Sequence, residues 1–359
     1  EKSMKKLLLF VMIVTMLVAS AFSFKAIMVT DTGGLGDKSF NDGTWSGVLR
    51  AKNELKIEAE VIVSKEQTDY IPNLTDAAKR SDVVLAVGFL MADALAKIAP
   101  QFPDKKFIGI DIVIDPIPSN VALYNFKEQE SAFLVGYIAG SVNKTGKVGF
   151  LGGIKVPAVA RFEIGYRAGI AAYNQLKGKN TEVLIAYANH FGDAPKGKSL
   201  SLAQMEQGAD IVFAAAGATG NGAFEAAKEK ALALYALKDG ASLDAIKNAY
   251  KKAGKGYFAI GVDVDQDYLA PGIILASAMK GIDVAAFDGI KSAMGRKFAS
   301  GNNVVGLKEN GVRLSALTYT KDMIDPVALK EIEKIIEDIK SGKLVIPEDE
   351  VGLKNFKVN

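Results

Sequence analysis

The sequence VVLAVGFLMADALAKIAPQFPDKKFIGID, residues 83–111, has the pattern of a strand, a helix and a second strand. The runs 83–87 and 107–111 are short and apolar and contain β-branched residues, whereas 92–102 places apolar residues at helical spacing. Strands that alternate with helices in this way form parallel sheets covered by helices on both faces. The stretch therefore predicts an α/β fold.

The same alternation extends outward in two series. Strands are predicted at 26–30, 59–64, 83–87, 107–111 and 120–126, then at 147–152, 182–188 and 210–216, and finally at 257–263, 273–279 and 313–319. Two series of about four strands each predict two doubly wound lobes. Segments near 124–128, 261–267 and 314–321 are predicted to cross between the lobes as a three-segment hinge.

The predicted division of the chain follows from these crossings. The first lobe is expected to comprise residues 24–125 plus 264–313, and the second lobe 126–263 plus 314–325. Residues 326–359 are expected to form a C-terminal helix and tail. An additional helical segment is predicted at about 231–255.

Residues 1–23 have the pattern of a signal peptide. Lys5 and Lys6 precede an apolar run from Leu7 to Val18, and small residues follow. This run is shorter than the ~20 residues that span a bilayer as a helix; an anchor that is never cleaved is the alternative. The chain has no cysteine, so neither a disulfide nor a lipoprotein thiol is expected. We predict an exported protein, periplasmic or extracytoplasmic, that is soluble after signal cleavage.

The charge balance argues against nucleic acid as a partner. The chain carries 44 Lys and Arg against 41 Asp and Glu, and part of that small excess lies within the predicted signal peptide. Proteins that bind nucleic acid need a basic surface for the phosphates. Such a surface is not expected here.

Polar residues follow the predicted strands at the edge where open α/β sheets bind ligands. Those that come directly after a strand or close behind it are Asp31, Asp111, Phe191, Gly217, Asp263 and Lys280. Carboxylates that accept hydrogen bonds from vicinal hydroxyls or ring N–H groups suit a polyol or a heterocycle.

Phe40 and Phe191 can stack on both faces of a flat base. Several aspartates without an arginine cluster repel phosphate, which favours a nucleoside over a nucleotide. For any one of these residues, a helix cap, a turn or ordinary core packing is the alternative.

Three other motifs are weaker indications of function. DTGG (31–34) resembles an aspartic-protease loop, but a second copy is missing and the α/β pattern is wrong for that fold. GATGNG (217–222) is expected to present backbone donors at a helix N-terminus. His190 is the only histidine and is expected in an exposed loop. We predict neither a metal, a cofactor nor an enzymatic activity.

Five stretches of the chain carry a family resemblance: DTGGLGDKSFND (31–42), ESAFLVGYIAG (130–140), FLGG (150–153), FGDAPKGK (191–198) and GVDVDQ (261–266). Together they resemble the basic membrane protein family of substrate-binding proteins of ABC transporters. The resemblance implies a type I periplasmic-binding fold and a purine nucleoside ligand such as adenosine, guanosine or inosine. It also implies ABC transporter permease subunits as partners, and we expect a monomer.

The resemblance also implies roles for particular residues. Phe40 and Phe191 match the rings that stack on the purine. Asp31, Asn41 and Asp111 match polar contacts to the ligand, Asp111 on the base. Gly217, Asp263 and Lys280 match the ribose side. Family members are often lipoproteins, and the missing cysteine departs from that pattern.

Three alternatives remain open from the sequence. The ligand of the same fold can be riboflavin or a sugar. The chain can be a nucleoside-acting enzyme, which turnover would reveal. It can also be a sensor subunit with the same cleft.

Overall fold

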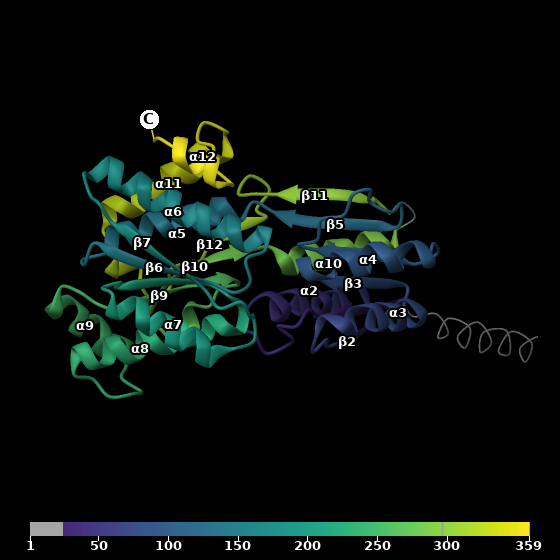
Figure 1. Cartoon of the computed structure of the whole chain (residues 1–359), viewed down its shortest axis with the longest axis horizontal. Coiled ribbons are helices and arrows are strands. Elements are labelled where there is room, and N and C mark those ends of the chain that lie inside the picture. Colours follow the sequence, from purple (N-terminus) through teal and green to yellow (C-terminus); the bar gives the residue numbers. More distant parts are fainter. Residues whose placement is uncertain (1–23, 296–297, 359) are drawn as a thin grey trace, which may run out of the picture.

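Two six-stranded sheets form the centres of two lobes (Figure 1). The computed structural model describes residues 24–295 and 298–358, so the predicted signal peptide lies outside the described residues. The first sheet has the order β11 (Gly301–Val305), β5 (Val121–Phe126), β4 (Lys106–Ile110), β3 (Val83–Val87), β1 (Lys25–Val29) and β2 (Glu58–Ile62), and all its neighbours run parallel.

The second sheet repeats this order. It runs β12 (Val312–Leu314), β10 (Ile274–Lys280), β9 (Phe258–Asp263), β8 (Ile211–Ala215), β6 (Lys147–Gly152) and β7 (Glu182–Tyr187). β12 is antiparallel to β10, and the other pairs are parallel. The predicted two-lobed α/β fold is confirmed.

Helices cover both faces of each sheet. The first lobe has α2 (Phe40–Leu55), α3 (Tyr70–Arg80), α4 (Ala92–Ile98) and α10 (Ile282–Met294). The second has α5 (Glu128–Val142), α6 (Pro157–Lys177), α7 (Ala194–Glu206), α8 (Asn221–Tyr235), α9 (Leu243–Ala253), α11 (Pro326–Lys340) and α12 (Glu350–Asn355).

Alternate residues of a central strand reach opposite faces of the sheet. In β1, Ala26 and Met28 join the buried cluster that contains residues of α2 and α10, whereas Ile27 and Val29 join residues of α3 and α4. All five residues of β3 are buried. The run VVLAV is apolar throughout because helices cover it on both faces.

The chain crosses between the lobes three times. It leaves the first lobe between β5 and α5, returns between β10 and α10, and leaves again between β11 and β12. The first crossing agrees with the predicted segment 124–128. The prediction at 261–267 is wrong, because the loop after β9 leads to β10, its parallel neighbour in the same sheet. The prediction at 314–321 is wrong because the chain has already joined the second sheet at β12, so this crossing lies before residue 312.

The sheet pairing also corrects the predicted division of the chain. Residues 274–280 and 312–313 were assigned to the first lobe, but both β10 and β12 are hydrogen-bonded in the second sheet. The return to the first lobe consists of α10 and β11. β11 was not predicted: its sequence GNNVV is polar and lies half-exposed or exposed at the edge of the sheet.

The predicted additional helical segment at 231–255 contains the end of α8 and all of α9. Ile246 of α9 is buried with α8 and β9, and the Tyr250 ring packs edge-on against Phe258. This segment lies on the outside of the second lobe, away from α2 and α10 (Figure 1). Among residues 24–295 and 298–358, we find no helix with the length and apolar character that a membrane crossing requires.

Candidate functional site

A cavity lies between the two lobes and is lined by residues of both. Its lining residues are Asp31, Gly33, Asp37, Phe40, Asn41, Gly88, Phe89, Leu90, Asp111, Val156, Ala158, Val159, Phe162, Phe191, Ala215, Ala216, Gly217, Val262, Asp263 and Lys280. About 610 Å³ of space in and around it is free of protein atoms, including open solvent at its mouth. The structure brings all eight sequence-predicted site residues together at this cavity.

Two of the aspartates occupy equivalent positions in the two lobes. Asp111 comes directly after β4, and Asp263 is the last residue of β9. Both have left-handed backbone angles, with φ of 57° for Asp111 and 66° for Asp263. Non-glycine residues adopt this conformation rarely, and it concentrates at functional sites. The backbone turns at these two residues, at the ends of their strands, and their side chains line the cavity.

Asn41 is fixed by two carboxylates of the same lobe. Its Nδ2 donates to Asp31 Oδ1 at 2.9 Å and to Asp37 Oδ2 at 3.2 Å. Both of its N–H donors are therefore used, and its Oδ1 is buried without a hydrogen-bond partner among the described residues. A ligand that donates a hydrogen bond satisfies this oxygen, because buried polar atoms need partners.

Lys280 is the centre of a second polar group. Its ammonium is buried and contacts the Asp111 carboxylate, with Glu128 Oε1 at 3.6 Å and Asp263 Oδ1 at 3.7 Å. The ammonium also lies 4.8 Å from the centroid of the Phe40 ring. We refer to Lys280, Asp111, Glu128 and Asp263 as the lysine cluster.

Burial governs the ionisation of these groups. It raises the pKa of Asp31 and of Asp263, and it raises the pKa of Asp37 to about 6. Burial alone lowers the pKa of Lys280, but the surrounding carboxylates outweigh it and hold that pKa above its ordinary value. Lys280 is therefore a cation, and it is surrounded by acceptors of hydrogen bonds.

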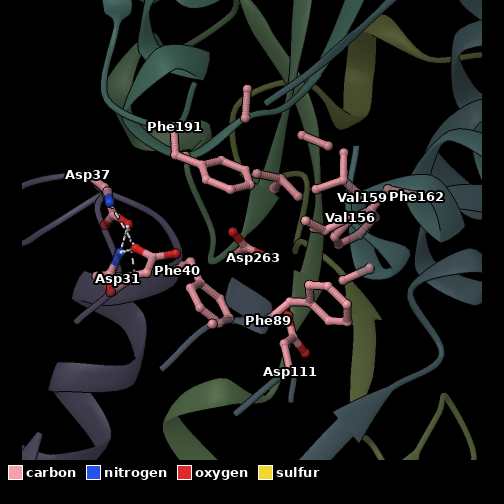
Figure 2. Close-up of a pocket in the computed structure, with 18 of the residues that line it drawn as sticks. Asp31, Asp37, Phe40, Phe89, Asp111, Val156, Val159, Phe162, Phe191 and Asp263 are labelled. Atoms are coloured by element: carbon pink, nitrogen blue, oxygen red, sulfur yellow. Dashed lines mark hydrogen bonds between the residues drawn. The ribbon is translucent and has the colours of Figure 1, made fainter. Parts of the chain in front are cut away.

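Two phenyl rings reach the cavity from different lobes. Phe40 begins α2 in the first lobe, and Phe191 follows β7 in the second. Figure 2 shows both rings projecting into the same space beside Asp263. The Phe191 ring lies against Gly153, where an added Cβ would be 2.4 Å from Cδ1 of the ring. A glycine is thus required at position 153 for this ring position.

Hydrogen bonds join the lobes next to the cavity. Gln266 Nε2 donates to the Lys38 carbonyl at 2.8 Å, and Asn221 Nδ2 donates to the Asp37 carbonyl at 3.3 Å. The loop 37–39 of the first lobe is therefore held by residues of the second.

Sequence reasoning missed several lining residues. Asp37 lies within the stretch DTGGLGDKSFND, so its position in that motif was an available signal. Phe89 follows β3 directly after Gly88, so its place behind a strand was also an available signal. Phe162, Val156 and Val159 carry no comparable signal, because their apolar side chains are indistinguishable from core residues until the lobes are in place.

The remaining motifs have modest roles. His190 is exposed, and its Nδ1 accepts a hydrogen bond from the Gly192 amide. Gly217 lines the cavity with φ of 56°. Over the part of the chain that the structure describes, no group of three or more His, Cys, Asp or Glu side chains is arranged to hold a metal ion.

The amino-acid sequence is similar to those of other proteins along most of its length. It is 32% identical over 339 residues to basic membrane protein A of Borreliella burgdorferi, covering 92% of this chain and 90% of that protein. It is 34% identical over 296 residues to an uncharacterized lipoprotein of Pyrococcus horikoshii, covering 81% of this chain and 68% of the relative.

Solved structures agree with the fold. An ABC transporter solute-binding protein of Aeropyrum pernix K1 superimposes with a TM-score of 0.79 at 29% identity, over 92% of this chain and 96% of that one. A carbohydrate transporter solute-binding protein of Agrobacterium radiobacter, 17% identical with a TM-score of 0.54, shares the fold alone. The fold is that of type I periplasmic-binding proteins. The profile of the PnrA-like ABC transporter substrate-binding proteins matches residues 24–350, and the chain belongs to this family.

Proposed function

We propose that this substrate-binding protein captures a purine nucleoside between its two lobes and delivers it to the permease subunits of an ABC importer. The observation that carries the proposal is the combination, at one cavity, of two phenyl rings from opposite lobes with buried acceptors that have no hydrogen-bond partner in the described part of the chain. A purine base offers two flat faces for Phe40 and Phe191. Its N–H groups and the ribose hydroxyls offer hydrogen-bond donors.

The acceptors divide into two groups that suit the two halves of a nucleoside. Asn41 Oδ1 at the start of α2 and the Asp31 carboxylate just after β1 lie side by side and suit the base edge. Asp263 and Lys280 lie together on the second lobe and suit vicinal hydroxyls, because the carboxylate accepts and the ammonium donates. Gly217 lets the ribose approach the backbone closely.

The same charges disfavour a nucleotide. Asp31, Asp37, Asp111 and Asp263 line the cavity, and Lys280 is the one lining residue with a basic side chain among the described residues. A phosphate group in this space would face several carboxylates at short range. We therefore expect nucleosides to bind much more tightly than their 5′-monophosphates.

Calorimetric titration of ligand-free protein with guanosine, inosine, adenosine, riboflavin and D-ribose tests the ligand class. Saturable binding of a nucleoside supports the proposal, whereas binding confined to riboflavin or the sugar refutes it. Chromatography of the ligand after prolonged incubation tests the enzyme alternative. Recovery of intact nucleoside is expected, and free base would contradict a binding role.

We also propose that the protein works outside the cytoplasm as a monomer, released by cleavage near Phe24. Membership in an extracytoplasmic binding-protein family supports the location. N-terminal sequencing and fractionation of the protein from its native host test the release. A membrane-bound form would instead agree with the relatives that are named lipoproteins.

A further inference from the structure

The ammonium of Lys280 lies where the two lobes meet. Lys280 is the last residue of β10, directly before the chain crosses back into the first lobe. It contacts Asp111, which belongs to the first lobe, while Glu128 and Asp263 of the second lobe lie 3.6 and 3.7 Å away. One cation is therefore shared by carboxylates from both lobes.

Glu128 is the member of the lysine cluster that does not line the cavity. It is the first residue of α5, directly after the first crossing, and it is fully buried. Its Oε2 accepts a 2.6 Å hydrogen bond from Arg161 Nε on α6. Its Oε1 faces Lys280 but has no hydrogen-bond partner within the described part of the chain. Asp111 Oδ1 also lacks a hydrogen-bond partner among the described residues. The cluster thus contains more acceptors than Lys280 satisfies.

When the lobes separate, Asp111 moves away from the other members of the lysine cluster. Glu128, Arg161, Asp263 and Lys280 all lie on elements of the second lobe, so they stay together when the lobes separate. That group is electrically balanced, with two cations and two carboxylates. Closure adds Asp111, whose carboxylate takes the direct contact with Lys280 and is repelled by the other two carboxylates.

We propose that Glu128 is a positioning residue that competes with Asp111 for Lys280 and so favours the open arrangement until a ligand occupies the cavity. A ligand that donates a hydrogen bond to Asp111 Oδ1 satisfies the acceptor that Lys280 leaves unpaired, and it thereby offsets the repulsion. Ligand binding and lobe closure are coupled because only the closed, occupied state satisfies these carboxylates. This coupling goes beyond the identity of the ligand.

The test is the distance between the lobes in ligand-free protein. The chain has no cysteine, so Lys52→Cys on α2 and Glu206→Cys on α7, both exposed, provide unique sites for spin labels. In this background, Glu128→Gln removes the competing charge and keeps an oxygen for Arg161. We expect the distance distribution by pulsed EPR to shift to shorter values. Dissociation of bound guanosine is expected to slow about tenfold.

Glu163→Gln is the matched control. Glu163 is a buried carboxylate of α6 that is likewise paired with an arginine. Its partners, Arg167 Nη1 at 2.9 Å and the Tyr187 hydroxyl at 2.6 Å, both lie in the second lobe, and it is not part of the lysine cluster. The distances of this variant are expected to equal those of the wild type. Asp111→Asn is the reciprocal variant: it weakens the partner in the closed state, so its ligand-free distances are expected to be longer. Asparagine tolerates the left-handed backbone at this position.

A Glu128→Gln distribution equal to that of Glu163→Gln, or shifted to longer distances, would overturn the inference. Thermal melting of each variant identifies one that fails to fold, and in that case the direction of the Asp111→Asn shift decides. A wild type that binds none of the nucleosides would refute the proposed function. The ligand-free distances would still decide the role of Glu128.

Discussion

The hydroxyl of Ser39 donates a 2.6 Å hydrogen bond to Asp263 Oδ2, which joins residues 224 positions apart in the sequence and on opposite lobes. Both side chains are buried. The other oxygen of Asp263 lies 3.7 Å from the Lys280 ammonium. One carboxylate therefore contributes both to lobe closure and to the polar wall of the cavity.

Replacement of the Asp263 carboxylate should weaken nucleoside binding strongly. We expect Asp263→Asn to reduce the affinity by roughly 1.5–3 kcal/mol, because a charge-assisted acceptor is lost. Asparagine is compatible with φ of 66°, so the fold should persist. Asp265→Asn, two residues on and not a lining residue, is the control in calorimetric titration. Unchanged affinity in Asp263→Asn would rule out a ligand contact.

Phe40 and Phe191 should act as a pair because they lie on different lobes. Each single change to Ala is expected to weaken binding by roughly 1–3 kcal/mol. The double variant should lose less than the sum, because an open lobe already lacks the second ring. Small-angle scattering should show a fall in radius of gyration on adding nucleoside to the wild type, and a smaller fall for Phe191→Ala at equal ligand. Additive losses with unchanged scattering would mean that the rings are ordinary core residues.

Gly153 should be required for binding although it offers no side chain to the ligand. An alanine Cβ there would lie 2.4 Å from the Phe191 ring, so Gly153→Ala must displace the ring. We expect a loss of affinity close to that of Phe191→Ala. Gly220→Ala in the same lobe is the control, because its Cβ meets its nearest neighbours at an ordinary 3.4 Å. Equal affinities for the two variants would contradict the requirement.

Asp267 should make stability depend on pH in a predictable direction. Burial raises its pKa from 3.8 to about 6, and one of its oxygens lacks a hydrogen-bond partner among the described residues. The folded state therefore binds this proton more tightly than the unfolded state. The stabilisation is fully present below about pH 4 and is lost as the pH rises through about 6.

The variant Asp267→Asn isolates this group, since its amide does not ionise. Urea unfolding followed by circular dichroism should find it more stable than the wild type at pH 8 by about 3 kcal/mol. The difference should shrink toward pH 4. A difference that does not vary with pH would show that Asp267 titrates as an ordinary exposed carboxylate.

The sequence alone determined the α/β class, the two lobes and the edge at which the site lies. It did so because strand and helix periodicities are local, and because the carboxyl ends of parallel strands meet at one edge of a sheet. Reading the residue after each strand was enough to find Asp31, Asp111 and Asp263. The stretches DTGGLGDKSFND and FGDAPKGK added Phe40, Asn41 and Phe191 through the family resemblance.

Tertiary structure alone decided which sheet each returning strand joins. β10 and β12 pair with the second sheet, and the polar edge strand β11 pairs with β5, through backbone hydrogen bonds that side-chain patterns do not encode. The burial of Lys280 beside Asp111 and Glu128 likewise depends on packing between segments more than 100 positions apart. The raised pKa of Lys280, and the proposed competition between Glu128 and Asp111, arise only when these groups are buried together.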